Sequence, residues 1–334
     1  MLRVKRSTIA LYLAPMFLVV AILTLYPILY TIYLSFTNKA LLYHFFEYDW
    51  VWLQNYGKLI FDIHSDFYFV TLLTLLYVVV CITLFLIVGL ACALALNNQK
   101  IRWLPFWRVL LIVPWAVPSI ITALIWRFLF QDPFGPINQI AVRLFGPHAE
   151  YDFLHHPVSA FIAVVVVNLW LSFSPYTVII LGALQSIPAD LYEAASVDGA
   201  TAWQSFTRIT VPLLRPALTP FTILSAIGTF QMFNTVFLVT GGGPFASATS
   251  RGATEFVMIY VYDKIFGATA GNVKYGLIAA YSVLIFLVLL AATLFTLRAT
   301  NLIEPPEGES RRPSLWKRLL ALRATARPAE EVQA

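Results

Sequence analysis

Long apolar stretches that carry no charged residue recur along the whole chain. A helix that crosses the hydrocarbon of a bilayer needs about 20 apolar residues, because no water there satisfies free backbone groups. Six stretches meet this requirement. We therefore expect an all-α, polytopic membrane protein with six transmembrane helices, near residues 9–36, 70–97, 108–130, 158–184, 216–239 and 276–298.

The polar stretch between the fourth and fifth apolar stretches reads LYEAASVDGATAWQSFTRITVP, residues 191–212. Pro188 suits the first turn of a helix, and Asp190 and Glu193 place negative charge near the positive end of the helix dipole. Gly199 is expected to break this helix. The pattern predicts a short helix that starts at Pro188 and stops before Gly199.

A second short helix is expected directly after that break. Thr201 and Gln204 have the spacing of a capping box, and we expect the helix to end near Pro212. Residues 188–207 contain no Lys or Arg, whereas helices that lie on a membrane surface are usually basic. We therefore interpret the segment as a helix–turn–helix that enters a groove on a partner, with Ala194 and Ala195 as its slim side. The apolar anchors are Leu191 and Tyr192, and the polar ones are Glu193 and Asp198.

Composition and charge fix the setting and the orientation. Of 334 residues, 60% are hydrophobic and 12% charged, against about 25% charged in soluble domains. Basic residues concentrate on the cytoplasmic side of membrane proteins. Placing both termini in the cytoplasm leaves only seven of the 22 Lys and Arg residues outside, namely Lys39, Lys58, Arg127, Arg143, Arg251, Lys264 and Lys274. Both termini are therefore predicted to be cytoplasmic.

The ends of the chain are predicted to lie outside the membrane. Residues 1–8 form a short cytoplasmic N-terminus, and the first apolar stretch is too long for a signal peptide, so we expect it to be retained. Residues 301–334 form a basic cytoplasmic tail in which RRPSLWKRLLALR is amphipathic. This piece either rests on anionic membrane lipid or serves as simple positive-inside anchoring.

The sequence lacks the motifs of a catalytic or nucleotide-binding site. No H-E-x-x-H, G-x-S-x-G or Walker loop is present, so the chain is not expected to be an enzyme or to bind ATP itself. Nothing points to a nucleic acid partner. His155 and His156 near Asp152 suggest a metal, but a neutral role is the better interpretation of so few ligands. Cys81 and Cys92 lie too far apart along one helix to form a disulfide.

The polar segment resembles the EAA loop of the permease subunits of bacterial ABC importers. The residue types that agree are Glu193, Ala194, Ala195, Asp198, Gly199, Ala200, Phe206, Ile209 and Pro212. In that family the loop, here residues 185–213, docks into a cleft on a cytoplasmic ATPase. The resemblance implies that Leu191, Tyr192, Glu193, Ala194, Ala195, Asp198, Gly199 and Ala200 couple the chain to the ATPase.

Further segments narrow the resemblance to the carbohydrate importers. The segments WRVLLIVPWAVPSIITALIWRFLF, GPINQI, LVTGGGPFASAT and YGLIAAYS are similar to the first permease subunit of the maltose and glycerol-phosphate type. The similarity spans about residues 9–300, which we take as one transmembrane domain of the type I ABC importer fold. One departure is FYFVTLLTLL at the start of the second stretch, where the family has an Asn-Thr pair.

The resemblance implies half of a pore in the bacterial cytoplasmic (inner) membrane. The expected partners are a second permease, two ATPase subunits that bind ATP and Mg, and an extracytoplasmic binding protein, while this chain binds no cofactor. The expected substrate is a sugar, most simply a di- or oligosaccharide. Two alternatives stay open. One is an ABC importer for glycerol phosphate or an amino acid; the other is a six-helix secondary transporter, which would need buried ionisable residues for ion coupling.

A sugar path needs hydrogen-bonding groups and flat apolar faces inside the membrane. The candidates for substrate contact are Asn168, Trp170, Ser172, Ser174 and Tyr176 on the fourth helix, Gln231, Phe233 and Asn234 on the fifth, and Tyr281 on the sixth. The alternative is that these residues hold helices together, at about 0.6 kcal/mol each.

Turns and prolines give the last expectations. Gly241, Gly242, Gly243 and Pro244 must form a sharp turn at the outer mouth, where the binding protein is expected to touch the chain. Residues 254–266 read as an amphipathic outer helix. The pairs Pro114 with Pro118 and Pro216 with Pro220 either act as hinges or give static kinks.

Overall fold

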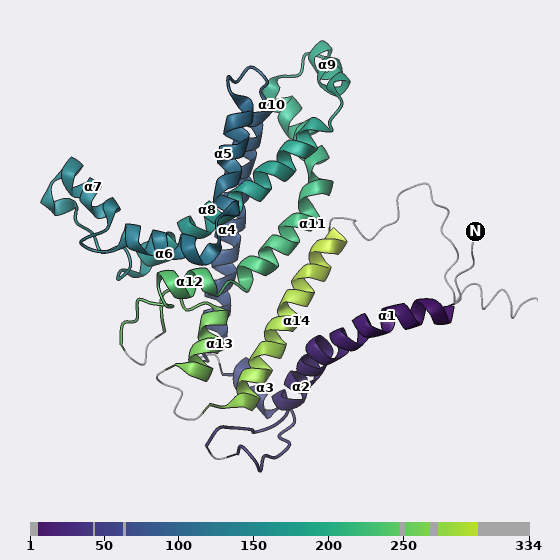
Figure 1. Ribbon diagram of the computed structural model, residues 1–334, viewed down its shortest axis with the longest axis vertical. Helices are drawn as coiled ribbons and strands as arrows, with labels where there is room; N and C mark the ends of the chain where they lie inside the picture. The colour runs from purple at the N-terminus through teal and green to yellow at the C-terminus, as the bar shows by residue number, and fades with distance from the viewer. Residues whose placement is uncertain (1–5, 43, 63–64, 248–250, 268–272, 300–334) are drawn as a thin grey trace, which may run out of the picture. The chain divides into compact units, whose positions relative to one another are not determined.

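The computed structural model describes residues 6–42, 44–62, 65–247, 251–267 and 273–299 (Figure 1). Among these residues the regular structure is helical, and the only β-type pairings are two isolated bridges, Thr37–Trp50 and Phe245–Gly252. In chain order the elements are α1 (Arg6–Val20), a π-helical turn η1 (Ala21–Leu25), α2 (Tyr26–Ser35), α3 (Gln54–Ile60), α4 (Asp66–Asn97), α5 (Leu104–Ala116), α6 (Ser119–Phe130), α7 (Pro136–Phe145), a 3₁₀ turn η2 (Pro147–Ala149), α8 (Pro157–Gln185), α9 (Ala189–Val197), α10 (Ala202–Ser205), a π-helical turn η3 (Phe206–Thr210), α11 (Val211–Phe230), α12 (Asn234–Val239), α13 (Val257–Phe266) and α14 (Tyr275–Ala299).

Within the described ranges, 5 helical runs are long and apolar enough to cross a membrane. They cover Leu11–Ser35, Asp66–Asn97, Pro157–Gln185, Ala202–Phe230 and Tyr275–Arg298. The pair α5 and α6 brings the number to 6 if it is taken as one broken span. The expectation of six apolar spans is thus confirmed in number and approximate place.

The third predicted span is not one straight helix, and its break lies at Pro118, one of the two prolines expected to bend it. Helices α5 and α6 are bent by 92° relative to each other. Helix α5 ends at Ala116 and Val117 is extended, with φ −79° and ψ 131°. The ring of Pro118 crowds the backbone of the residue before it and disfavours the helical conformation there, which explains the break at this point.

The fifth predicted span differs from expectation at both ends. Helix α11 stops at Phe230, and a separate short helix, α12, begins at Asn234, so the predicted helix over 216–239 is interrupted. At the other end the helix does not stop near Pro212. The wide turn η3, in which Val211 N–H bonds Phe206 O, carries the chain from α10 into α11 and accommodates a proline that lacks an N–H.

Helices α4 and α8 pack along each other and form the centre of the bundle (Figure 1). A Cβ at Gly89 of α4 would lie 2.6 Å from the Cβ of Tyr176 on α8, so only glycine permits this approach. Lipid is as apolar as the side chains, so helices in membranes associate through close packing of small residues rather than through a hydrophobic effect. Like Gly89, the buried residues Ala93, Ala160 and Ala163 are small.

A second buried cluster joins the start of α4 to α3, α13 and α14. Its buried members are Leu59, Phe67, Val70, Phe230, Val257, Ala280, Tyr281 and Ile285. Val257 N–H donates to Thr74 Oγ1 on α4 at 3.0 Å, which fixes the first turn of α13 against α4. A helix is confirmed within the predicted stretch 254–266, where α13 covers Val257–Phe266.

The chain divides into two compact units with the boundary between Thr293 and Leu294. The helices described above, up to that boundary, belong to the first unit. Of the second unit, the structure describes only the last residues of α14. The predicted cytoplasmic tail, residues 301–334, and most of the predicted N-terminal segment, residues 1–8, lie outside the described residues.

Candidate functional site

The polar segment between the spans folds as a helix–turn–helix, as its sequence predicts. Helix α9 starts after Pro188 and ends at Val197, and Gly199 adopts φ +78°. Gly199 N–H bonds Ser196 O at 3.1 Å and Ala200 N–H bonds Ala195 O at 2.9 Å. This pair of bonds is a Schellman motif, which needs the left-handed conformation that glycine adopts without steric cost.

The start of α10 carries the capping box that the spacing of Thr201 and Gln204 predicts. Gln204 N–H donates to Thr201 Oγ1 at 3.3 Å, and Thr201 N–H donates to Gln204 Oε1 at 2.7 Å. Two of the free donors at the start of the helix are therefore satisfied. The turn at Gly199 and this cap together fix the angle between α9 and α10.

No residue of α9 is buried in this chain. Leu191 and Val197 of α9 are 43% and 89% exposed, and Trp203 of α10 is 71% exposed, although all three side chains are apolar. Tyr192 is half-buried, and its hydroxyl lies 2.9 Å from Thr210 Oγ1, which connects α9 to the turn before α11. Helix α9 thus presents apolar and acidic side chains that no described residue covers.

A continuous helical run links this segment to the membrane interior. Residues Ala202–Phe230 form one apolar run of 29 residues, which at 1.5 Å per residue is roughly 44 Å long. The run ends at the break formed by residues 231–233 (Figure 1).

Three of the residues predicted to contact substrate lie at this break rather than on a fifth helix. Gln231 and Asn234 are exposed, and Phe233 is half-buried with its ring 5.1 Å from that of Phe237. Tyr262 of α13 packs on Phe233 at 5.0 Å. The break exposes two polar side chains beside an aromatic face.

The predicted residues on α8 divide into a buried group and an exposed one. Asn168 is fully buried, with Nδ2 3.5 Å from Cys81 Sγ and Oδ1 accepting from Ser172 Oγ at 3.2 Å. Tyr176 is buried between Phe85 and Phe221. Trp170 is 43% exposed and its ring lies 6.0 Å from that of Trp126. Of these side chains, only Trp170 is largely open to a solute in this chain.

Two further predicted side chains are buried. Ser174 lines a small cavity between α5 and α8, and its Oγ has no hydrogen-bond partner among the described residues. Tyr281 packs between Phe67 and Tyr260, with ring centroids 5.3 and 5.2 Å away. Tyr281 belongs to the second buried cluster, which also contains Phe230, the residue directly before the break at residues 231–233.

The glycine turn after α12 is folded against the segment before α13. Gly241 and Gly242 have φ +61° and +88°, and Gly242 and Gly243 are buried. Thr254 N–H donates to Gly242 O at 3.0 Å, and the Thr254 hydroxyl donates to Gly243 O at 2.6 Å. Gly241 and Pro244 are both partly exposed, so the turn is accessible at its two ends.

Two polar contacts near α6 and α8 involve residues that the sequence did not predict to be functional. Arg127 Nη1 donates to Leu238 O at 3.2 Å and so joins α6 to α12. The pattern gave no signal for this contact, because Arg127 falls at the end of an apolar stretch. His155 Nδ1 lies 2.8 Å from Asp152 Oδ1. No cluster of three metal-ligating side chains occurs in the part of the chain that the structure describes.

Comparison with known proteins places these features in a family. Residues 85–305 match the family described as binding-protein-dependent transport system inner membrane component. The maltose/maltodextrin transport system permease protein MalF of Vibrio vulnificus is 37% identical over 242 residues, which cover 72% of this chain and 46% of that protein. The galactooligosaccharides transport system permease protein GanP of Bacillus subtilis is 32% identical over 292 residues, which cover 86% and 68%.

The fold is also found in a solved structure. A crystal structure of a bacterial ABC transporter involved in the import of the acidic polysaccharide alginate contains a chain that matches with a TM-score of 0.70 and 19% identity, covering 89% of this chain and 96% of that one. The present chain spans about half the length of the maltose permease that it matches. The match over residues 85–305, two thirds of the chain, confirms the resemblance inferred from the polar loop. The chain belongs to the family of inner-membrane components of binding-protein-dependent transport systems.

Proposed function

We propose that this chain is the pore-forming permease subunit of an ATP-driven importer for a sugar. The relatives named for maltose, maltodextrin and galactooligosaccharides support an oligosaccharide as the substrate class. The chain works with a second permease, a pair of ATPase subunits that hold ATP and Mg, and an extracytoplasmic binding protein. It does not hydrolyse ATP itself, and both of its termini face the cytoplasm.

The exposed helix α9 carries this proposal. Apolar side chains such as Leu191 and Val197 are uncovered on a segment that also presents Glu193 and Asp198. Burial of such a mixed surface in a groove on an ATPase gives both contact area and orientation. ATP-driven closure of the ATPases shifts α9 and thereby favours the outward-facing arrangement of the spans.

The continuous run from Ala202 to Phe230 gives a path for this shift. Its far end is the break at residues 231–233, where Gln231 and Asn234 are exposed next to Phe233. Sugar hydroxyls need hydrogen-bonding partners, whereas the flat face of a pyranose packs on an aromatic ring. We assign substrate contact first to these three residues and to Trp170, and an interhelical packing role to the buried Asn168 and Tyr176.

The outer end of the pathway involves the turn after α12. Gly241, Gly242 and Gly243 shape this turn, and Pro244 presents its accessible face to the binding protein. Because Gly242 and Gly243 are buried, their role is to position the turn rather than to touch the partner directly.

A matched pair of glycine variants tests the coupling role. Gly199 and Gly146 have φ +78° and +90°, and a Cβ at either position meets no atom within 4 Å. Asp at each position adds the same charge, and the backbone strain is no smaller at Gly146, whose ψ of 174° lies in a region that essentially only glycine adopts. Only Gly199→Asp changes the turn after α9. We expect Gly199→Asp to reach the membrane at normal levels and to abolish sugar uptake while ATP hydrolysis no longer responds to the binding protein.

Gly146→Asp serves as the control and is expected to retain uptake. Normal uptake by Gly199→Asp, at membrane levels equal to those of the parent chain, contradicts the coupling role of α9. Equal loss of uptake in both variants also contradicts it, because the effect then follows from backbone strain or added charge in general.

A further inference from the structure

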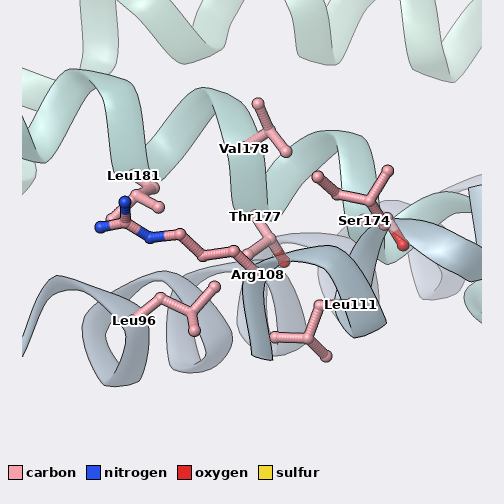
Figure 2. A pocket seen from close by; sticks show the side chains of 8 residues that line it. Leu96, Arg108, Leu111, Ser174, Thr177, Val178 and Leu181 are labelled. Atoms are coloured by element: carbon pink, nitrogen blue, oxygen red, sulfur yellow. The ribbon is translucent and has the colours of Figure 1, made fainter. Parts of the chain in front are cut away.

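A narrow cavity of about 190 Å³ lies between α5, α8 and the end of α4 (Figure 2). Its walls are mostly apolar and include Leu96, Leu111, Val178 and Leu181. Two polar side chains, Arg108 and Ser174, interrupt this apolar lining. Apart from Ser174, none of these residues is assigned above to substrate contact or to coupling.

Arg108 extends along the cavity and its guanidinium lies at the end marked by Leu96 and Leu181 (Figure 2). The Nε atom is shielded from solvent and has no acceptor among the residues that the structure describes. A buried donor that is left unpaired costs about 1–3 kcal/mol, and more when the group is charged. The cavity therefore presents a cation whose hydrogen-bonding capacity an external anion would fill.

The cavity is polarised along its length. Leu96 and Leu181 lie near the last residues of their helices, Asn97 and Gln185, so the guanidinium end faces a membrane boundary. Ser174 is seven residues deeper on α8, about 10 Å at 1.5 Å per residue, and lies at the opposite end of the cavity (Figure 2). Charge at the boundary and apolar walls toward the interior match the arrangement of a membrane amphiphile.

Additional positive charge lies beside the guanidinium end. Residues 98–103 connect α4 to α5, and Lys100 and Arg102 in this connection are exposed. Basic residues next to a membrane surface attract anionic lipid by about 1 kcal/mol each. The charges of the connection and of Arg108 therefore act on the same headgroup.

We propose that this cavity binds one anionic phospholipid of the membrane. Its phosphate accepts hydrogen bonds from the Arg108 guanidinium, and the first part of one acyl chain lies between Leu111 and Val178 and reaches Ser174. A free inorganic phosphate would satisfy Arg108 but would leave the apolar walls empty. A neutral lipid would fill the walls but would leave Arg108 without net negative charge to pair with.

Lipid binding to the purified full chain tests this site. Native mass spectrometry in a neutral detergent would measure retention of phosphatidylglycerol and of phosphatidylcholine with the same acyl chains. We expect a clear preference for phosphatidylglycerol and about a tenfold loss of that binding in Arg108→Gln, as removal of a charged hydrogen bond implies. Arg102→Gln, which removes an exposed charge from the same region, should weaken the binding less than Arg108→Gln does, by about fivefold at most, because such a charge attracts anionic lipid by about 1 kcal/mol.

A second variant keeps the charge and fills the apolar walls. Val178→Trp should weaken phosphatidylglycerol binding as strongly as Arg108→Gln does, with normal elution on size exclusion as the folding control. If Arg108→Gln does not fold, Val178→Trp alone decides the question. Equal binding of the two lipids, or unchanged binding in Val178→Trp, overturns the proposal.

Two further outcomes also overturn the proposal. Inorganic phosphate that saturates the Arg108 site, with an affinity unchanged by Val178→Trp, identifies the occupant as a free anion. Loss of the bound lipid on assembly with the second permease, together with cross-linking of residue 108 to that subunit, identifies the occupant as the partner chain.

Discussion

Arg251 Nε lies 2.6 Å from Asp66 Oδ1 and joins the segment before α13 to the first residue of α4. Asp66 Oδ2 also accepts from Tyr260 Oη at 3.2 Å and lies 3.6 Å from Lys264 Nζ. A single carboxylate thus connects α4 to three side chains of the segment 251–267, which contains α13. The pairs are about one-third exposed, so each contributes only modestly to stability.

Substitution of Asp66 by Asn should weaken the attachment of the segment 251–267 to α4 and so lower the stability of the fold. We expect a loss of no more than about 1 kcal/mol, because solvent screens these partly exposed pairs. The temperature of heat-induced unfolding in detergent should fall by a few degrees, and high salt should shrink the difference from the parent chain. Glu47→Gln, which removes an exposed acid elsewhere, is the control, and a salt-independent loss would argue against an ionic origin.

The turn at Gly242 should tolerate no side chain. A Cβ there would lie 2.8 Å from Ile259 Cγ2, and the backbone has φ +88°. Gly242→Ala therefore combines backbone strain of about 1–2 kcal/mol with overpacking of about 1–3 kcal/mol. Gly199→Ala, at φ +78° with nothing within 4 Å of its Cβ, carries the left-handed strain alone. The two unfolding temperatures should differ clearly; equal values would show that the contact with Ile259 is unimportant.

The hydrogen bond between Tyr192 and Thr210 should help to transmit movement of α9 to α11. Tyr192→Phe removes a bond worth about 1 kcal/mol and should reduce uptake without reducing the amount of protein in the membrane. Thr210→Val should have the same effect. If the two hydroxyls act through each other, the double variant should be no worse than either single one. Strictly additive losses would mean that they act separately.

The buried carboxyl of Glu255 should make the stability of the fold depend on pH. Burial raises the pKa of Glu255, although Gly252 N–H donates to its Oε2 at 2.9 Å and opposes this shift. The folded state then holds its proton to higher pH than the unfolded state does, so stability falls as pH rises from about 4.3, the ordinary value, through the raised pKa. Unfolding temperatures of the parent chain should decline over this range, and Glu255→Gln should flatten the decline.

Asp152 provides the contrast for that measurement. Burial raises the pKa of Asp152, but the hydrogen bonds and charge of His155 together with the backbone of Leu154 outweigh burial, so the pKa is lowered. Its contribution to stability is therefore present above the ordinary pKa and is lost as pH falls through the lowered one. The parent chain should lose a small part of its stability at acid pH, and Asp152→Asn should not show this loss. An identical pH profile for Asp152→Asn and Glu255→Gln would refute both assignments.

Sequence patterns predicted features that depend on neighbouring residues. Charge-free apolar stretches located the spans, and the spacing of Thr201 and Gln204 predicted a capping box that the structure confirms. Gly199 marked the turn because only a left-handed residue closes that motif. Such features depend on local backbone chemistry, which a sequence carries directly.

Features that depend on distant contacts were not predicted. Hydropathy gives the length of an apolar stretch but not its direction, so a bend near Pro118 was expected but its size of 92° between α5 and α6 was not. The break after Phe230 contains neither Gly nor Pro and gave no signal. Polarity alone could not separate buried Asn168 from exposed Gln231, because burial depends on which helices pack together. The guanidinium cavity at Arg108 was missed for the same reason.

Labelling of Val197 tests the central claim most directly, since this residue of α9 is 89% exposed. A Val197→Cys variant, in a chain with Cys81→Ser and Cys92→Ser, would be treated with a membrane-impermeant maleimide in whole cells and in inverted vesicles. Residue 197 should react only in the inverted vesicles, and co-assembly with the ATPase should protect it. Reaction from the outside of intact cells, or unchanged reaction in the presence of the ATPase, would contradict the role of α9 as the docking helix.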